Sequence, residues 1–178
     1  MNELAIICVD DDTAILSSLE MEIKNIFGNS YIIELAENGN DAIEICNELL
    51  KAKIAVVLVI SDYIMPDMKG NKLLKHIHQL SPKTVKIMLT GQADLEAISQ
   101  AMTCDNLYRY IAKPWQIEEL QLILINALHS YNQDTKLIDF NNDLETRAEK
   151  LMQEIQETNQ VILELNQDKD KVISLFSE

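Results

Sequence analysis

The N-terminal two thirds of the chain alternate between short apolar runs and longer amphipathic ones. The apolar runs are rich in Ile, Val and Leu and have the length of buried strands. They cover Leu4–Val9, Tyr31–Ala36, Val56–Ser61, Val85–Leu89 and Leu107–Ala112. The amphipathic runs between them predict helices over Thr13–Phe27, Asn40–Leu50, Lys69–Leu80, Leu95–Met102 and Gln116–Leu128.

This alternation of strands and helices predicts an α/β domain with a parallel sheet, because crossover helices join parallel strands. Five such units make a doubly wound domain of three layers over residues 1–128. The third run, VVLVIS, is apolar at nearly every position. It should therefore be a central strand that is covered on both faces.

Residues 129–178 follow a different pattern. Pro114 is the last proline and Gly91 the last glycine, so nothing after Trp115 interrupts a helix. Positions in steps of four and three form a heptad seam over more than five repeats. They are Leu137, Asn141, Leu144, Ala148, Leu151, Ile155, Thr158, Ile162, Leu165, Lys169, Val172 and Phe176. We expect a parallel homodimeric coiled coil here, because a single solvated helix, the alternative, would leave the apolar stripe wet.

Composition narrows the classes of partner. The net charge of −14 argues against non-specific binding to nucleic acid or to anionic lipid. No apolar stretch is long enough to span a bilayer, and the N-terminus has no signal-peptide pattern. Three cysteines, Cys8, Cys46 and Cys104, lie in apolar runs and form no C-x-x-C pair. These features are typical of a reduced, cytoplasmic protein.

Chemically active side chains follow the ends of four predicted strands. Asp10, Asp11 and Asp12 follow the first strand, Asp62 the third, Thr90 the fourth and Lys113 the fifth. The carboxyl ends of parallel strands share one edge of the sheet, where ligands bind. Clustered carboxylates repel each other and would not stay ionised together without a cation. A site made of oxygen ligands favours Mg²⁺. With their charge shielded, one carboxylate could attack phosphorus while Lys113 and Thr90 bind the transferred group.

Four runs at these strand ends resemble the signature of response-regulator receiver domains. They read I-C-V-D-D-D, V-I-S-D-Y-I-M-P-D-M-K-G, I-M-L-T-G and Y-I-A-K-P-W. The resemblance covers roughly residues 4–128, and the spacings of Met65-Pro66 and Gly70 after Asp62 also fit. It implies a flavodoxin-like, five-stranded sheet of order 2-1-3-4-5.

The resemblance also implies roles for individual residues. Asp62 matches the phosphoacceptor, and Asp10, Asp11, Asp62 and the carbonyl of Ile64 match the Mg²⁺ ligands. Lys113 matches the lysine that contacts the phosphoryl group. In this family the bond that corresponds to Lys113-Pro114 is typically cis, which helps to direct the lysine towards the site. Thr90 and Tyr110 match the switch pair, although Tyr110 could also be plain sheet packing, and Gly91 matches a position that must be small. The donor would be a histidine kinase or a histidine phosphotransfer protein, and such a switch is not usually called an enzyme.

Three alternatives stay open at this point. Haloacid-dehalogenase-type phosphatases share this chemistry but carry a second acid where the chain has Ile64. A degenerate receiver that acts as a dimerising adaptor would be expected to lack some of these residues. The run K-D-K-V-I-S-L-F-S resembles the stretch before the phospho-accepting histidine of sensor kinases, which favours a fragment of a hybrid kinase. An apolar side chain at Ile64 cannot orient an attacking water, but Gln92, two residues past Thr90, could still do so. Asp12 could cap the first predicted helix.

Overall fold

The computed structural model describes residues 3–91 and 107–176 of the chain. The predicted helix over Leu95–Met102, together with Gln92 and Cys104, lies outside these residues. The strands are β1 (Leu4–Val9), β2 (Ile32–Ala36), β3 (Ala55–Asp62), β4 (Val85–Gly91) and β5 (Arg109–Lys113). The helices are α1 (Thr13–Phe27), α2 (Gly39–Lys51), α3 (Gly70–Leu80) and α5 (Ile117–Leu175).

The five strands form one parallel sheet in the order β2-β1-β3-β4-β5. This topology confirms the predicted fold class. The order reverses between β1 and β3, where Val9 at the end of β1 lies beside Ala36 of β2 and Ser61 of β3. Ligands of doubly wound sheets bind beyond such a reversal, at the carboxyl ends of the strands.

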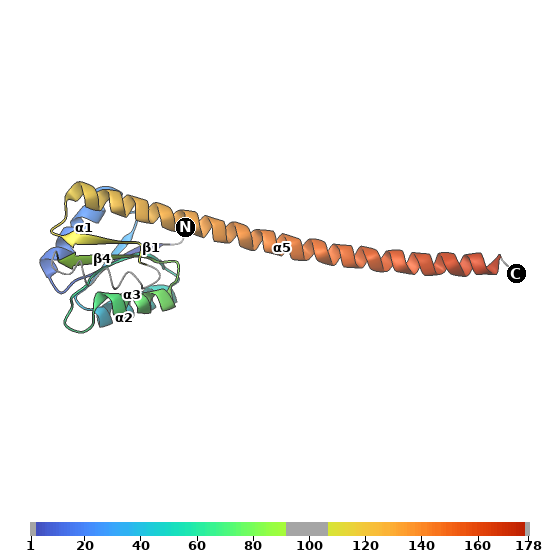
Figure 1. Ribbon diagram of the computed structural model, residues 1–178, viewed down its shortest axis with the longest axis horizontal. Helices are drawn as coiled ribbons and strands as arrows, with labels where there is room; N and C mark the ends of the chain where they lie inside the picture. The colour runs from blue at the N-terminus through green and yellow to red at the C-terminus, as the bar shows by residue number, and fades with distance from the viewer. Residues whose placement is uncertain (1–2, 92–106, 177–178) are drawn as a thin grey trace. The chain divides into compact units, whose positions relative to one another are not determined.

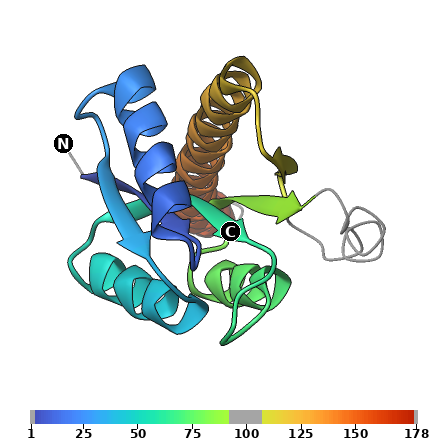
Figure 2. The same ribbon diagram turned by 90° about the vertical axis from the view of Figure 1, so that its left-hand side faces the viewer.

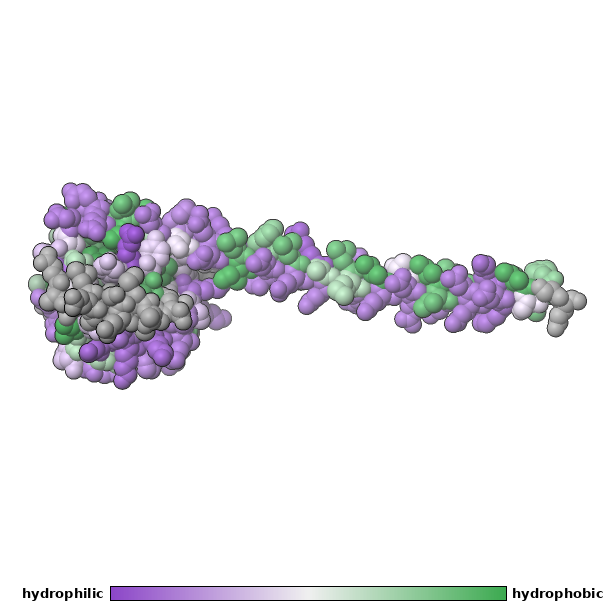
Figure 3. Space-filling model, viewed as in Figure 1, coloured by the Kyte–Doolittle hydropathy of each residue, from purple (hydrophilic) through white to green (hydrophobic). Residues whose placement is uncertain are grey.

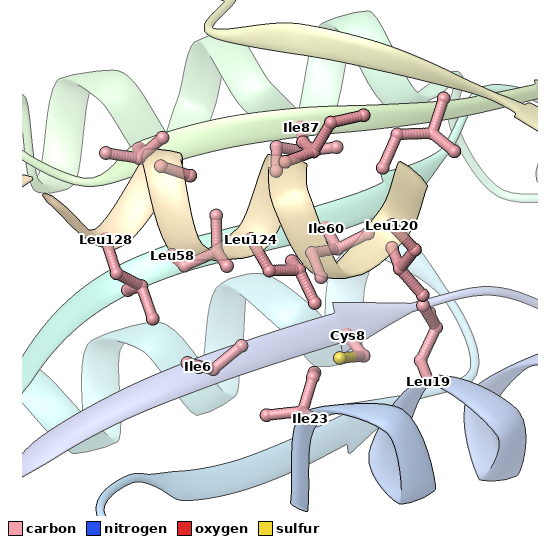
Figure 4. Packing of buried hydrophobic residues seen from close by; sticks show 14 of the residues in the cluster. Ile6, Cys8, Leu19, Ile23, Leu58, Ile60, Ile87, Leu120, Leu124 and Leu128 are labelled. Carbon is pink, nitrogen blue, oxygen red and sulfur yellow. The ribbon is translucent and has the colours of Figure 1, made fainter. Parts of the chain in front are cut away.

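Helices cover both faces of the sheet (Figures 1 and 2). One face packs against α1 and the beginning of α5, where Leu58 and Ile60 of β3 meet Leu120 and Leu124 (Figure 4). The other face packs against α2 and α3, to which β3 contributes Val56 and Val59. The strand β3 is thus buried on both faces, as the apolar run VVLVIS predicts.

Local signals set the ends of the first helix. The Asp12 side chain accepts a hydrogen bond from the N–H of Ala14 at 2.8 Å, which makes Asp12 the N-cap of α1. At the other end, Gly28 has a positive φ of 59° and donates its N–H to the carbonyl of Lys24. A left-handed conformation of this kind is where glycine is favoured.

Contacts within the chain divide it into two units, Met1–Asp134 and Thr135–Glu178. The described part of the second unit is helical through Leu175. Its large apolar side chains are exposed, from 37% for Ile138 to 88% for Phe176. They recur among polar side chains along the helix (Figure 3). The predicted boundary between residues 128 and 129 stays a prediction, and so does pairing with a second copy.

None of the helices in the described ranges combines the length and the apolar character needed to cross a membrane.

Candidate phosphorylation site

The strands bring the predicted acidic residues together. Asp10 directly follows β1, Asp11 is the next residue, and Asp62 ends β3. One carboxylate oxygen of each lies within 4.8 Å of the others. Asp10 and Asp62 are buried, at 0% and 5% exposure, whereas Asp11 is exposed to solvent. Three carboxylates with one open side suit a hard divalent cation that keeps some of its water, so this donor set fits Mg²⁺.

Lys113 links two of these carboxylates from the end of β5. Its Nζ lies 2.9 Å from Oδ2 of Asp10 and 2.6 Å from Oδ1 of Asp62. Burial works to lower the pKa of Lys113, but hydrogen bonds and the charges of Asp62 and Asp10 raise it above the usual lysine value. The ammonium therefore stays charged. The bond between Lys113 and Pro114 is cis, as the resemblance implies.

Opposing effects act on the pKa of the Asp62 carboxyl group. Burial raises its carboxyl pKa, and the neighbouring charge of Asp10 adds to the rise. The hydrogen bond and charge of Lys113 oppose it, as does the N–H of Ile64, which donates to Oδ2 of Asp62 at 3.1 Å. Added positive charge would favour the ionised form of Asp62, which is the form that can act as a nucleophile.

The consecutive acids take different positions. Asp10 accepts hydrogen bonds from Lys113 and from the N–H of Asp12 at 2.9 Å. Asp12 caps α1 and is exposed. The capping interpretation of Asp12 is therefore confirmed, whereas the metal-ligand roles of Asp10 and Asp11 remain predictions.

The predicted switch residues lie on neighbouring strands but do not share an environment. Thr90 is buried, and its hydroxyl donates to the carbonyl of Gly91 at 3.0 Å. Tyr110, on β5, is 37% exposed. Thr90 lies opposite Ala112, and Tyr110 opposite Met88, in the β4–β5 register. Their switch role stays a prediction. The side chain of Ile64, the third predicted residue near Asp62, is exposed at the rim of the site.

The loop from Asp62 to α3 shows why Gly70 follows at its fixed distance. The N–H of Gly70 donates to the carbonyl of Tyr63 at 2.9 Å. A Cβ at position 70 would collide with the backbone carbonyl of Asp62. The loop also holds a residue that sequence reasoning missed. The Asp67 carboxylate accepts hydrogen bonds from backbone N–H groups at the start of α2. These partners lie 27 and 28 residues away in sequence, so no local sequence pattern predicts the contact.

Comparison with known proteins agrees with this geometry. The family model described as response regulator receiver domain matches residues 6–125. The chain therefore belongs to the response-regulator receiver family. This assignment decides against the haloacid-dehalogenase-type alternative.

The similar proteins include a transcriptional regulator, a sensor kinase and a receiver domain of known structure. The DNA-binding transcriptional regulator NtrC of Salmonella typhimurium is 33% identical over 125 residues, or 70% of this chain and 25% of NtrC. The sensor kinase CckA of Brucella abortus is 26% identical over 65% of this chain and 11% of CckA. A signal receiver domain of an HD domain-containing protein from Pseudomonas fluorescens is 35% identical with a TM-score of 0.62, over 75% of this chain and 99% of that one. The chain spans about a quarter or less of the length of the curated relatives it matches.

Proposed function

We propose that this chain is the phosphoacceptor of a two-component phosphorelay, and that it receives a phosphoryl group on Asp62. The observation that carries the proposal is the Asp62 carboxylate held between Lys113 and two further acids. The donor would be the phosphohistidine of a histidine kinase or a phosphotransfer protein. Incubation with acetyl phosphate and Mg²⁺ should label Asp62, and an unlabelled protein at saturating donor would contradict the proposal.

The transfer exchanges one bond to phosphorus for another. The Asp62 carboxylate attacks phosphorus, an oxygen–phosphorus bond forms, and the phosphorus–nitrogen bond to the donor histidine breaks. The imidazole leaves with the electron pair of that bond. Lys113 binds the phosphoryl oxygens and stabilises their charge. Mg²⁺ held by Asp10, Asp11, Asp62 and the carbonyl of Ile64 would supply further positive charge.

The response to phosphorylation would pass through Thr90 and Tyr110. The hydroxyl of Thr90 would leave the carbonyl of Gly91 and bind the phosphoryl group, and the ring of half-exposed Tyr110 would turn inward. The chain would catalyse its own phosphorylation and later hydrolysis but no turnover of a separate substrate, and it would act in the cytoplasm. Similarity to both a transcriptional regulator and a sensor kinase leaves a receiver within a hybrid kinase as a second candidate.

The lifetime of the phosphoryl group should depend on Ile64. Its side chain is 58% exposed at the rim of the site, and it cannot hold an attacking water. Ile64→Asn should speed loss of phosphate several-fold, because an amide can orient water. Leu122→Asn, on α5 at 60% exposure, is the matched control and should leave the rate unchanged. The decay of the labelled protein measures the rate of phosphate loss in both variants. Equal decay in the Ile64 variant and in the wild type would show that another group controls the lifetime.

The second unit would form a parallel dimer. One set of seam positions contains Ile155 and Ile162, and the other contains Leu144, Leu151 and Leu165. Isoleucine at the first seam position with leucine at the second favours two parallel strands. Asn141 and Lys169 share the first set, where single polar residues fix register at some cost in stability. Over the seam from Leu137 to Phe176 the contact would run about 60 Å at about 1.5 Å per residue.

Disulfide trapping tests this arrangement. Leu144→Cys and Ile162→Cys should each cross-link to the same residue of a second copy, because parallel seam positions bring equal residues within disulfide reach. Gln160→Cys, on the opposite side of the helix, should not cross-link. The chain with its native cysteines gives the background, and a beryllofluoride mimic should change the yields if phosphorylation alters the packing. A monomer at micromolar concentration, or equal yields at all three sites, would contradict the dimer.

A further inference from the structure

The segment between Asp62 and α3, residues 63–69, carries a part of the site that no helix or strand supports. Its first residues touch the phosphoacceptor directly, because the N–H of Ile64 donates to Asp62. Its far end is fixed where Gly70 donates to the carbonyl of Tyr63. Between these two points Met65 is buried in the core, whereas Ile64, Pro66, Asp67 and Lys69 are exposed, so core packing holds Met65 but not the stretch around Asp67.

Asp67 ties this middle part to another element. Its Oδ2 accepts a hydrogen bond from the N–H of Asn40 at 2.9 Å, and its Oδ1 accepts one from the N–H of Gly39 at 3.2 Å. Both donors lie in the first turn of α2, where backbone N–H groups have no partner within the helix. A carboxylate is favoured there by the helix dipole. The same turn receives a local cap from Asn38, whose side chain accepts from the N–H of Asp41.

Packing reinforces the tie. The side chain of Met68 lies against Gly39 so closely that a Cβ at position 39 would collide with it. Burial works to raise the pKa of Asp67, but the backbone N–H groups of Asn40, Gly39, Met68 and Asp67 itself lower it below the ordinary value. The carboxylate is therefore ionised at neutral pH and keeps its acceptor role.

We propose that Asp67 is a positioning residue for the phosphorylation site, which acts by anchoring the segment that carries Ile64. Ile64 precedes Asp67 by three residues. Movement of the segment would displace the Ile64 N–H from Asp62 and the Ile64 carbonyl from its place as a metal ligand. The inference rests on the proposed function for the metal and adds the contact with α2 as the support of that ligand.

The test compares Asp67→Ala with a matched variant at the same helix end. Asp41→Ala removes an equal charge from the first turn of α2 but leaves the segment untouched, since its carboxylate accepts from the Asn38 side chain. Mg²⁺ affinity is measured by titration of backbone amide resonances in the full chain, and the hydrogen exchange of the Ile64 amide is measured without Mg²⁺. Loss of a support behind a metal ligand costs about 10–100-fold in affinity in other sites.

We expect Asp67→Ala to weaken Mg²⁺ binding about tenfold and to speed exchange at Ile64. Asp41→Ala should change affinity less than about twofold, and Asp67→Asn should recover part of the loss, because its amide oxygen can accept one of the two hydrogen bonds. Wild-type affinity in both Asp67 variants, or an equal loss in Asp41→Ala, would overturn the role of Asp67 while the proposed function stands. A wild-type chain that binds no Mg²⁺ would instead overturn the proposed function and this role with it.

Discussion

Asp62→Asn should abolish phosphorylation of this protein by acetyl phosphate. An amide oxygen is a poor nucleophile and cannot form the acyl phosphate, whereas the rest of the site keeps its side chains. The amide is close in size to the carboxylate, so the buried position should tolerate it. Phosphate incorporation, followed by intact-protein mass spectrometry, should fall from the wild-type level to background.

The matched control for this variant is Asp12→Asn. Asp12 lies two residues from Asp10 but caps α1 and is exposed, and asparagine caps helices about as well as aspartate. It should be labelled like the wild type. Full labelling of Asp62→Asn would show that the phosphoryl group does not reside on Asp62, whereas loss of labelling in both variants would show that the loss is not specific to the Asp62 carboxylate.

Lys113→Met should impair both transfer and stability. Loss of one group that stabilises charge in a transition state typically costs about 10²–10³ in rate. The variant also leaves Asp10 and Asp62 without the ammonium that lies within 2.9 Å and 2.6 Å of them. Removing one partner of a buried pair costs about 3–5 kcal/mol. Because the Lys113 side chain is 24% exposed, we expect a value at the lower end.

Urea denaturation with and without Mg²⁺ separates these effects. If unpaired carboxylates cause the loss of stability, Mg²⁺ should restore part of it, since the cation offsets their charge. Lys24→Met is the control: its pair with Glu20 lies on the surface of α1, where such pairs contribute under about 1 kcal/mol. Equal stability of the two variants would contradict the view that Lys113 holds the acid cluster together.

Much of the fold and the site follows from local patterns. Apolar runs alternating with amphipathic ones predict the parallel sheet, and parallel strands bring their carboxyl ends to one edge. Strand order along the chain is therefore enough to group Asp10, Asp62 and Lys113 at that edge. The apolar character of β3 likewise indicates its central place, which burial on both faces confirms.

Other features depend on contacts that no local pattern encodes. Asp10, Asp11 and Asp12 are identical in type, yet Asp10 is buried against Lys113, whereas Asp11 and Asp12 are exposed and Asp12 caps a helix. The position that each of them takes depends on the turn after β1 and on β5, which is about a hundred residues away in sequence. The contact of Asp67 with α2 is hidden for the same reason, because its partners are distant backbone groups rather than a recognisable side chain.

Lys86 is a further case. It stands in an apolar strand pattern and is only 2% exposed, with its Nζ donating to the carbonyl of Thr84 at 2.6 Å. Burial lowers its pKa to about 8. The pattern marks the strand but gives no sign that a lysine inside it is buried, since that depends on what packs over β4.

We expect the phosphoryl group to reside on the carboxylate of Asp62. The most direct test is to phosphorylate the wild-type chain with acetyl phosphate and Mg²⁺, reduce the acyl phosphate with borohydride, and map the reduced residue by peptide mass spectrometry. Reduction converts a phosphorylated aspartate to homoserine, which marks the site permanently. We expect homoserine at position 62 alone. Homoserine at position 10 or 11, or a phosphoryl group that survives reduction on a serine, threonine or histidine, would contradict it.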